Sequence, residues 1–450
     1  MKSWKKWTLR ILAVLALALA VVTIIFWPSI RILSGTGGLS GELSGIPTAS
    51  SELTDITKGD ADWISWLGAE GDNKSRVTGI SEDWSSGLTK LWDVSYLCQG
   101  KSSATWSAPV IQGNRLVVSG RMEDNDLIFC LDPLDGSLLW TQSYTVKSNA
   151  SHGAGPRATP YIDDDRVYTF GRSGDLQCLA LFDGKELWRK NVTNEGGLAP
   201  QWGYASSPLV IGDKVIVQGG AAAGLIAFDK MSGKAVWKSP NDMAGYAAIR
   251  SMELSGETAV LNFHGKGIAA VSVENGTELW NVPWETSYDV NATTPLVVDD
   301  SIFVTSGYKT GGGLLDVTSS NAKVRWKNEA ISSHHSDSYC IDGYLYGYTG
   351  DSAQNKGAFK CVRLADGEEQ WTTNEMGWGT CSYVDGYLLC MNIKGNIFLM
   401  KPDPKEFIKI TEMEKALGDI KGPVWTKPVI ANGHLYLRFK QNLVCYKLAQ

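Results

Sequence analysis

The sequence lacks the excess of positive charge that a nucleic-acid-binding protein needs. Its 42 basic and 48 acidic residues give a net charge of −6 at pH 7. When the five basic residues up to Arg31 are set aside, 37 basic and 48 acidic side chains remain, a net charge of about −11. Because such a body repels phosphate backbones, the composition argues against a nucleic-acid partner.

Common catalytic and metal-binding signatures are also absent. No Gly-x-Ser-x-Gly elbow, Gly-x-x-x-x-Gly-Lys phosphate loop or paired-carboxylate motif occurs. The five histidines show no ligand spacing, and the adjacent His334 and His335 would point to opposite faces of a strand. We therefore predict no metal site, although residues from distant parts of the chain can still assemble a catalytic site that no linear motif reveals.

Cysteine is placed in a way that disfavours a disulfide framework. Of the eight cysteines, Cys130, Cys178, Cys361 and Cys445 occupy corresponding positions inside apolar strands, which is typical of small core residues. None precedes position 98, so lipid attachment through an N-terminal cysteine is excluded.

One pair of cysteines is an exception. In CSYVDGYLLC, a hairpin turning at Asp385-Gly386 would place Cys381 opposite Cys390. The Cα atoms of a non-hydrogen-bonded pair lie roughly 4.5 Å apart, within bridging range. A disulfide between these two residues and a pair of free core thiols are both open interpretations.

The N-terminus differs in kind from the rest of the chain. Four basic residues in MKSWKKWTLR precede an apolar run from Ile11 to Trp27, which predicts a membrane anchor or signal over residues 1–32. An uncleaved transmembrane helix is favoured, because the sequence stays apolar beyond Ala18-Leu19-Ala20. The positive flank would stay in the cytoplasm. We therefore expect the body on the periplasmic or extracellular side of the inner (cytoplasmic) membrane, joined by a flexible Gly/Ser-rich linker over residues 33–61.

Residues 62–450 are built from a repeat. A phrase such as FDGKELW, an Asp-Gly turn followed by a tryptophan, recurs every 43 to 49 residues. That period is typical of four-stranded propeller blades. The Asp-Gly supplies a positive φ at a tight turn, which fits the excess of 48 glycines over 15 prolines. We expect each indole to be a structural wedge between blades; the repeated tryptophans are Trp92, Trp140, Trp188, Trp237, Trp280, Trp326 and Trp371.

A second recurring phrase lies between the tryptophans and has eight copies. Each copy, for example SSPLVIGDKVIVQG, alternates apolar and polar residues around a Gly, Asp or Asn turn, as a half-buried hairpin does. A third apolar strand follows, and then the tryptophan strand. Because the last copy lacks a following tryptophan strand, the strand around Trp92 would complete the last blade, and EFIKI near Phe407 would supply the missing outer strand. The predicted fold is all-β, an eight-bladed β-propeller of four-stranded antiparallel blades behind an N-terminal transmembrane helix.

The repeat resembles that of the PQQ-like (quinoprotein-type and BamB-like) propellers. The resemblance rests on GDLQCLALFDGKELW and on the opening ADWISWLGAEGDN, and it covers Asp62 to Gln450. It implies one of two activities: quinoprotein dehydrogenases hold PQQ and calcium and act on alcohols or sugars, whereas BamB-type members are cofactor-free periplasmic scaffolds. This sequence has neither the adjacent Cys-Cys that flanks the quinone nor a Cys-x-x-Cys-His haem motif. PQQ and calcium are therefore not expected, and a transmembrane helix would replace the lipid anchor of the scaffold branch.

Propellers bind ligands at the mouth of the central channel, where the loops before the innermost strands meet. We predict a ligand site there, with large polar groups at Arg250, Asp337 and Lys427; the alternative is that these groups hydrogen-bond one another. The candidate residues are Trp106, His152, Arg157, Trp202, Tyr204, Arg250, Tyr288, His335, Asp337, Trp378, Trp425 and Lys427. The expected function is an exported, membrane-tethered, non-catalytic propeller that binds a protein, peptide or small polar ligand as an assembly scaffold; the alternative is a PQQ-dependent dehydrogenase.

Overall fold

The computed structural model describes residue 48 and residues 55–146, 152–240, 242–351 and 356–449. The predicted membrane anchor, and most of the linker that follows it, lie outside these described residues. Within the described part, no helix is long and apolar enough to cross a membrane.

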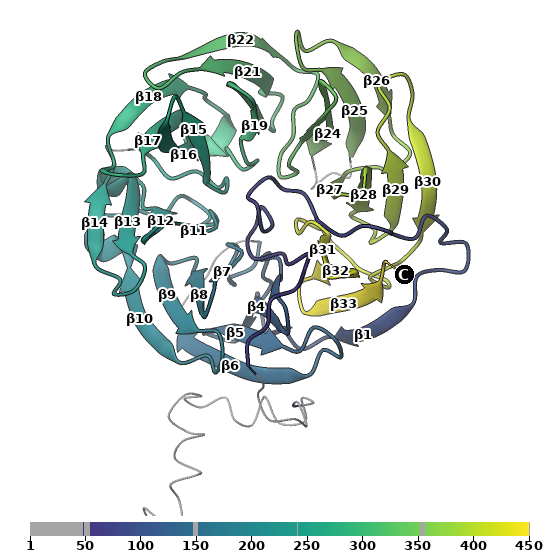
Figure 1. Cartoon of the computed structure of the whole chain (residues 1–450), viewed down its shortest axis with the longest axis horizontal. Coiled ribbons are helices and arrows are strands. Elements are labelled where there is room, and N and C mark those ends of the chain that lie inside the picture. The colour runs from purple at the N-terminus through teal and green to yellow at the C-terminus, as the bar shows by residue number, and fades with distance from the viewer. Residues whose placement is uncertain (1–47, 49–54, 147–151, 241, 352–355, 450) are drawn as a thin grey trace, which may run out of the picture.

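The described strands form eight sheets arranged as blades around a central axis (Figure 1). Seven blades have four antiparallel strands in sequence order from the axis outward, and the last blade takes its outer strand from the beginning of the described chain, which confirms the predicted propeller. The blade that begins the ring also carries a two-residue strand, β2, that pairs parallel with β4. The bounds of its strands are β2 (Cys98–Gln99), β3 (Val110–Gln112), β4 (Arg115–Met122), β5 (Asn125–Leu131) and β6 (Leu138–Thr145).

The next three blades also contain short 3-10 helices in their connecting loops. Their elements are β7 (Tyr161–Asp163), β8 (Arg166–Phe170), β9 (Asp175–Ala180), β10 (Glu186–Asn191), η1 (Val192–Glu195), β11 (Leu209–Ile211), β12 (Lys214–Gln218), η2 (Ala221–Ala223), β13 (Leu225–Asp229), β14 (Ala235–Lys238), β15 (Arg250–Leu254), β16 (Glu257–His264), β17 (Gly267–Ser272), β18 (Glu278–Pro283) and η3 (Ser287–Asp289).

The remaining blades bring the chain back to its starting point. Their strands are β19 (Leu296–Val298), β20 (Ser301–Ser306), β21 (Gly311–Val317), β22 (Ala322–Asn328), β23 (Tyr339–Ile341), β24 (Tyr344–Asp351), β25 (Lys356–Arg363), β26 (Glu369–Thr373), β27 (Gly379–Val384), β28 (Tyr387–Asn392), β29 (Ile397–Lys401), β30 (Ile408–Met413), β31 (Val429–Ala431), β32 (His434–Phe439) and β33 (Asn442–Lys447).

The ring closes through β1 (Lys90–Val94), which pairs antiparallel with β33 as the outer strand of the last blade. Figure 1 shows β1 and β33 side by side although they lie at opposite ends of the described chain. Closure removes two open sheet edges that would otherwise expose unpaired backbone groups.

The tryptophan of each repeat joins two blades. The indole Nε1 of Trp140 donates to the carbonyl oxygen of Leu181 in the next blade at 2.9 Å. Its ring also lies over the turn glycine of that blade, Gly184, whose φ is +72° and where an added Cβ would fall 2.4 Å from the indole. Trp92 and Trp188 make the same two contacts, with the turns that contain Gly136 and Gly233. The Asp-Gly turn and the tryptophan therefore recur together because each fits the other across a blade boundary.

The core is divided among these boundaries. One apolar cluster, for example, combines Val117 and Ile128 of one blade with Val167 and Leu179 of the next. This division is what radial stacking requires, because a single four-stranded blade cannot bury both of its own faces.

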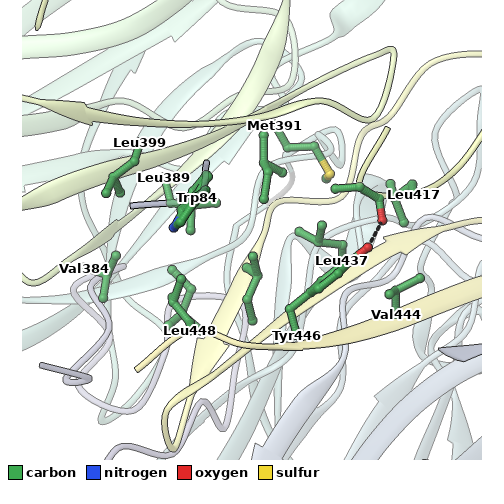
Figure 2. Packing of buried hydrophobic residues seen from close by; sticks show 14 of the residues in the cluster. Trp84, Val384, Leu389, Met391, Leu399, Leu417, Leu437, Val444, Tyr446 and Leu448 are labelled. Atoms are coloured by element: carbon green, nitrogen blue, oxygen red, sulfur yellow. Dashed lines mark hydrogen bonds between the residues drawn. The ribbon is translucent and has the colours of Figure 1, made fainter. Parts of the chain in front are cut away.

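The blade formed by β27–β30 lacks a repeat tryptophan. At the equivalent position of β30, one residue after the bulge in its pairing with β29, the chain has Thr411. An indole reaches this boundary from elsewhere: the backbone N–H of Trp84 donates to the Thr411 hydroxyl at 3.3 Å, and the side chain is 2% exposed. Figure 2 shows Trp84 beside Leu389 in this cluster. Phe407, which we expected in the outer strand, lies just before β30 and contacts Trp371.

The segment before β1 crosses one end of the ring. Trp63 exchanges two backbone hydrogen bonds with Ile111 of β3, and Gly79 donates to the side chain of Asp385 across the ring. Figure 1 shows this purple segment running over the ring and past its centre. Ile111 stands one residue from the end of the innermost strand β3, and Asp385 lies in the turn between β27 and β28. The segment therefore covers the end of the channel at which first and second strands turn, and leaves the opposite end to the connecting loops.

Cys381 and Cys390 pair directly across the β27–β28 hairpin, as the turn at Asp385-Gly386 predicts. The structure contains both as buried free thiols rather than as a disulfide. Burial raises the pKa of Cys381 well above its usual range, which keeps its thiol protonated and unreactive.

Candidate functional site

A cavity of about 240 Å³ lies on the propeller axis, at the end of the ring formed by the connecting loops. The loops before seven different innermost strands supply most of its wall, and small side chains such as Ala205 and Ala292 leave space near the axis. Its lining consists of Trp66, Trp106, His152, Arg157, Trp202, Ala205, Ser207, Tyr246, Ala248, Val290, Ala292, Tyr308, His334, His335 and Trp425.

Aromatic rings form an almost continuous belt around this cavity. On one side, Trp202 lies 5.8 Å from Tyr246 and 6.1 Å from Tyr288, measured between ring centroids. Tyr288 in turn contacts Tyr308, and Tyr308 contacts His334 at 4.7 Å.

The belt continues through a pair of imidazoles. His334 and His335 stack at 3.8 Å, and His335 is followed by Trp425 at 5.0 Å. Trp425 then contacts Trp106 at 4.5 Å and His152 at 5.9 Å. The wall of the cavity is thus made of flat apolar faces edged by few polar groups, a surface that favours aromatic or apolar groups of a ligand.

Charge in the cavity is of one sign. Burial, reinforced by neighbouring Arg172, lowers the pKa of Arg157 to about 10, so its guanidinium is charged at neutral pH. Burial, with His334 and Arg157 adding to it, holds the pKa of His335 well below its usual range, so its imidazole is neutral. No described residue that lines the cavity is acidic. The site therefore combines aromatic surface with one cation.

The floor of the cavity is Trp66, which the crossing segment inserts into the channel. Its indole Nε1 donates to Asp337 at 3.1 Å, and Lys427 lies 4.0 Å from the centre of its ring. Lys427 also pairs with Asp337 at 3.3 Å and donates to Asn73. Burial lowers the pKa of Lys427 to about 8, while Asp337 opposes the shift. This buried network fixes the segment in the channel and seals its turn end.

Half of the predicted site residues line the cavity. They are Trp106, His152, Arg157, Trp202, His335 and Trp425. Tyr288 stands at the rim, 65% exposed, and is joined to the belt through Trp202 and Tyr308.

The other predicted residues are placed elsewhere. Tyr204 and Trp378 are buried between strands, because Tyr204 packs against Phe170 and Trp378 against Tyr348.

The three large polar groups also lie outside the cavity. Asp337 and Lys427 hold the crossing segment, which is the hydrogen-bonded arrangement weighed as the alternative. Arg250 occupies a separate recess of about 160 Å³ beside the crossing segment and donates to the carbonyl oxygen of Pro295.

Sequence reasoning missed nine of the fifteen residues that line the cavity, among them one tryptophan and two tyrosines. Tyr246 lies in the loop before β15, four residues from Arg250, and could have been found as the aromatic residue of that loop. Tyr308 comes from the turn between β20 and β21, and Trp66 from the crossing segment. Neither belongs to a loop before an innermost strand, so the repeat pattern gave no signal for them.

The cavity residues do not fit a calcium-bound quinone. Calcium takes six to eight oxygen ligands, mostly carboxylates. The nearest carboxylate on the axis, Asp337, already accepts hydrogen bonds from Thr294, Trp66 and Lys427. Among the described residues no group of three His, Cys, Asp or Glu side chains is placed to hold a metal.

The closed ring of eight blades, joined at seven boundaries by a repeat tryptophan, defines a PQQ-like repeat propeller. A family model described as outer membrane protein assembly factor BamB matches residues 124–373, and the chain belongs to this family. Curated relatives of that name are 25% identical over 135 residues in Alkalilimnicola ehrlichii, and 24% identical over 199 residues in Burkholderia pseudomallei. The matches cover 29% and 44% of this chain and span only 32% and 46% of those relatives.

Solved structures share the fold at lower identity. BamB from Moraxella catarrhalis superposes with a TM-score of 0.57 at 17% identity, over 80% of this chain and 97% of that chain. A europium-containing methanol dehydrogenase superposes with a TM-score of 0.61 at 14% identity, over 84% of this chain and 89% of that chain. These structures therefore establish the propeller and do not distinguish a scaffold from an enzyme.

Proposed function

We propose that this chain is an exported, membrane-tethered propeller that acts as a non-catalytic assembly scaffold, and that its aromatic cavity binds a segment of a partner protein. The observation that supports this proposal most strongly is the aromatic belt at the open end of the channel. A partner segment with an aromatic or apolar side chain would stack inside the belt, and an acidic group on it would pair with Arg157.

The surface around the mouth supports a protein partner over a small ligand alone. Large apolar side chains stand exposed on this end of the ring: Leu198 at 66%, Met243 at 45% and Tyr288 at 65%. Leu198 and Met243 lie in the loops at this end, where their backbones bond with Gly219 and Gly265. Exposed apolar groups that surround an aromatic pocket are typical of protein interfaces.

The names of the matched relatives support a role in assembly. Both curated relatives are outer membrane protein assembly factors. A role of this kind in this chain would agree with a propeller on the periplasmic side, and the predicted helix over residues 1–32 would tether it to the inner membrane. No nucleic acid is involved in this proposal, and neither PQQ nor calcium has a part in it.

The quinone-dependent dehydrogenase is the alternative function. Its activity would require a calcium ligand set, and the residues around the cavity supply aromatic rings, imidazoles and one guanidinium instead. An absorbance spectrum with added PQQ and calcium, together with dye reduction in the presence of alcohols or sugars, tests this alternative. A bound chromophore with substrate-dependent dye reduction would replace the scaffold proposal.

Site-specific photo-crosslinking tests the scaffold proposal. A photoreactive phenylalanine analogue is placed at Tyr288 in the full chain, and the crosslinked products are identified in intact membranes. The matched control carries the same analogue at Val324, which is 37% exposed on the outer strand β22. We expect a discrete protein product from position 288 and none from position 324.

A second variant separates binding from mere proximity. Trp202→Ser removes the ring that contacts both Tyr246 and Tyr288 and should weaken the crosslink from position 288 several-fold. Equal products from positions 288 and 324, or a crosslink that Trp202→Ser leaves unchanged, would remove the cavity from consideration.

A further inference from the structure

Three successive blades expose a large apolar side chain at the same place. Leu134, Phe182 and Met231 lie in the turns between third and fourth strands and are 68%, 40% and 56% exposed. Each directly follows the carbonyl group that accepts the bond from the tryptophan of the preceding blade. Their shared register gives them equivalent positions in three successive blades, at the turn end that the crossing segment covers.

The neighbouring outer strands continue this apolar edge. Leu91, Leu187 and Val236 each stand one residue before a repeat tryptophan and are 41%, 39% and 52% exposed. Because Trp92 and Trp188 lie over the turns that carry Leu134 and Met231, Leu91 and Leu187 lie next to those turns. We call the set of Leu91, Leu134, Phe182, Leu187, Met231 and Val236 the apolar arc.

The apolar arc covers only half of the ring. In the other half, the residues that follow the accepting carbonyl groups are Glu274, Ser319, Ala365 and Pro404, and those that precede the tryptophans are Leu279, which is half-buried, Arg325 and Gln370. The same contacts between blades therefore form there without a large exposed apolar side chain at these positions. We therefore looked for a partner that would contact only the half of the ring that carries the apolar arc.

The path of the chain points to that partner. Thr48 forms a bridge with Leu138 in β6, so the N-terminal residues join the ring inside the arc. Twenty residues separate the apolar run ending at Trp27 from Thr48, and the linker expected from their sequence would have a root-mean-square span of about 25 Å. A propeller of this size is roughly 55 Å across. A tether attached at the arc would thus favour contact of this edge with the membrane over contact of the far edge.

The turns of the arc carry charges of both signs. Lys185 and Lys234 follow the turn glycines, and Asp135 and Asp183 directly follow Leu134 and Phe182. The exposed apolar side chains, rather than net charge, are therefore the groups that would enter the headgroup region of a bilayer.

We propose that the apolar arc docks on the lipid bilayer to which the N-terminal segment tethers the chain. This inference rests on the tether in the proposed function. Because the arc and the aromatic cavity lie at opposite ends of the ring, docking leaves the cavity open toward the space away from the membrane. The tether supplies the attachment and the arc supplies the orientation.

Lipid-borne quenchers test the docking. The full chain is reconstituted in vesicles of phosphatidylethanolamine and phosphatidylglycerol that carry nitroxide lipids, with a fluorophore on Phe182→Cys. The matched control is Ser320→Cys, in the equivalent turn of the β21–β22 blade on the far side of the ring (Figure 1). The parent chain gives the background from Cys340, the one described cysteine that is not fully buried. We expect the lipids to quench the label at position 182 several-fold more strongly than the label at position 320.

Glutamate substitutions in the arc, together with vesicle flotation, distinguish a failure of docking from a failure of the tether. Leu134→Glu and Met231→Glu, added to the Phe182→Cys chain, should reduce quenching to the level at position 320 while flotation with the vesicles is unchanged. Equal quenching at both positions in a chain that floats overturns docking, and a chain that does not float overturns the tether. A label at position 182 that is already shielded in detergent, without a bilayer, shows that a second copy or the N-terminal segment covers the arc and also overturns the proposal.

Discussion

Replacing Gly184 with alanine adds one Cβ atom and tests the contact between the Trp140 indole and the turn of the next blade. Alanine at the left-handed φ of +72° costs roughly 1–2 kcal/mol. The added Cβ would also fall 2.4 Å from the Trp140 indole, so the ring or the turn must shift. Overpacking of this kind adds about 1–3 kcal/mol, for a total loss of about 2–5 kcal/mol in the free energy of unfolding.

The matched control is Gly343→Ala. Gly343 has a similar φ of +80° but no atom within 4 Å of the added Cβ, so only the backbone cost of roughly 1–2 kcal/mol applies. For a propeller of this size each kcal/mol lowers the midpoint of thermal unfolding by about 1 °C. Near-ultraviolet circular dichroism should therefore show a clearly larger fall for Gly184→Ala. Equal shifts in the two variants would refute the role assigned to the tryptophan joint.

Three further predictions concern buried titratable groups. Lys427→Met leaves Asp337 buried without its cation and should cost about 3–5 kcal/mol in urea unfolding, whereas adding Asp337→Asn should recover part of that loss. Burial in the folded chain lowers the pKa of His335, so below about pH 6.5 the unfolded chain binds a proton that the folded chain does not. The free energy of unfolding should therefore fall as the pH drops below about 6.5. His335→Phe should reduce this fall by up to about 1.4 kcal/mol per pH unit. Without reductant, maleimide should modify Cys381 and Cys390 only after denaturation, and an intact disulfide would leave both unmodified.

The ring could be predicted from the sequence because its determinants are local and repeated. Gly184 and Trp140 belong to phrases that recur, and each phrase carries its own turn geometry and wedge. The pairing of β1 with β33 follows from counting strands at the two ends. Repetition also limits errors, because a copy with a degenerate sequence can be recognised from its spacing to the other copies.

The site was harder to predict because it depends on segments outside the repeat. Trp66 and Trp84 have no counterparts in other blades, yet one forms the floor of the cavity and the other fills the boundary that lacks its own tryptophan. The polar groups Asp337 and Lys427 suggested a ligand site on the axis, but the crossing segment satisfies both. Sequence spacing shows which loops converge and does not show which side chains are already paired by a distant segment.

Hydroxyl-radical footprinting of the full chain, in its native membrane and in detergent, tests most directly whether a partner binds at the aromatic cavity and the bilayer contacts the apolar arc. We predict that the membrane protects Tyr288 and Met243 at the mouth, through the partner, and Phe182 and Met231 on the apolar arc, through lipid. Val324 should react equally in both conditions. Unchanged reactivity of the mouth residues between membrane and detergent would contradict the central claim that the aromatic end of the ring holds a partner.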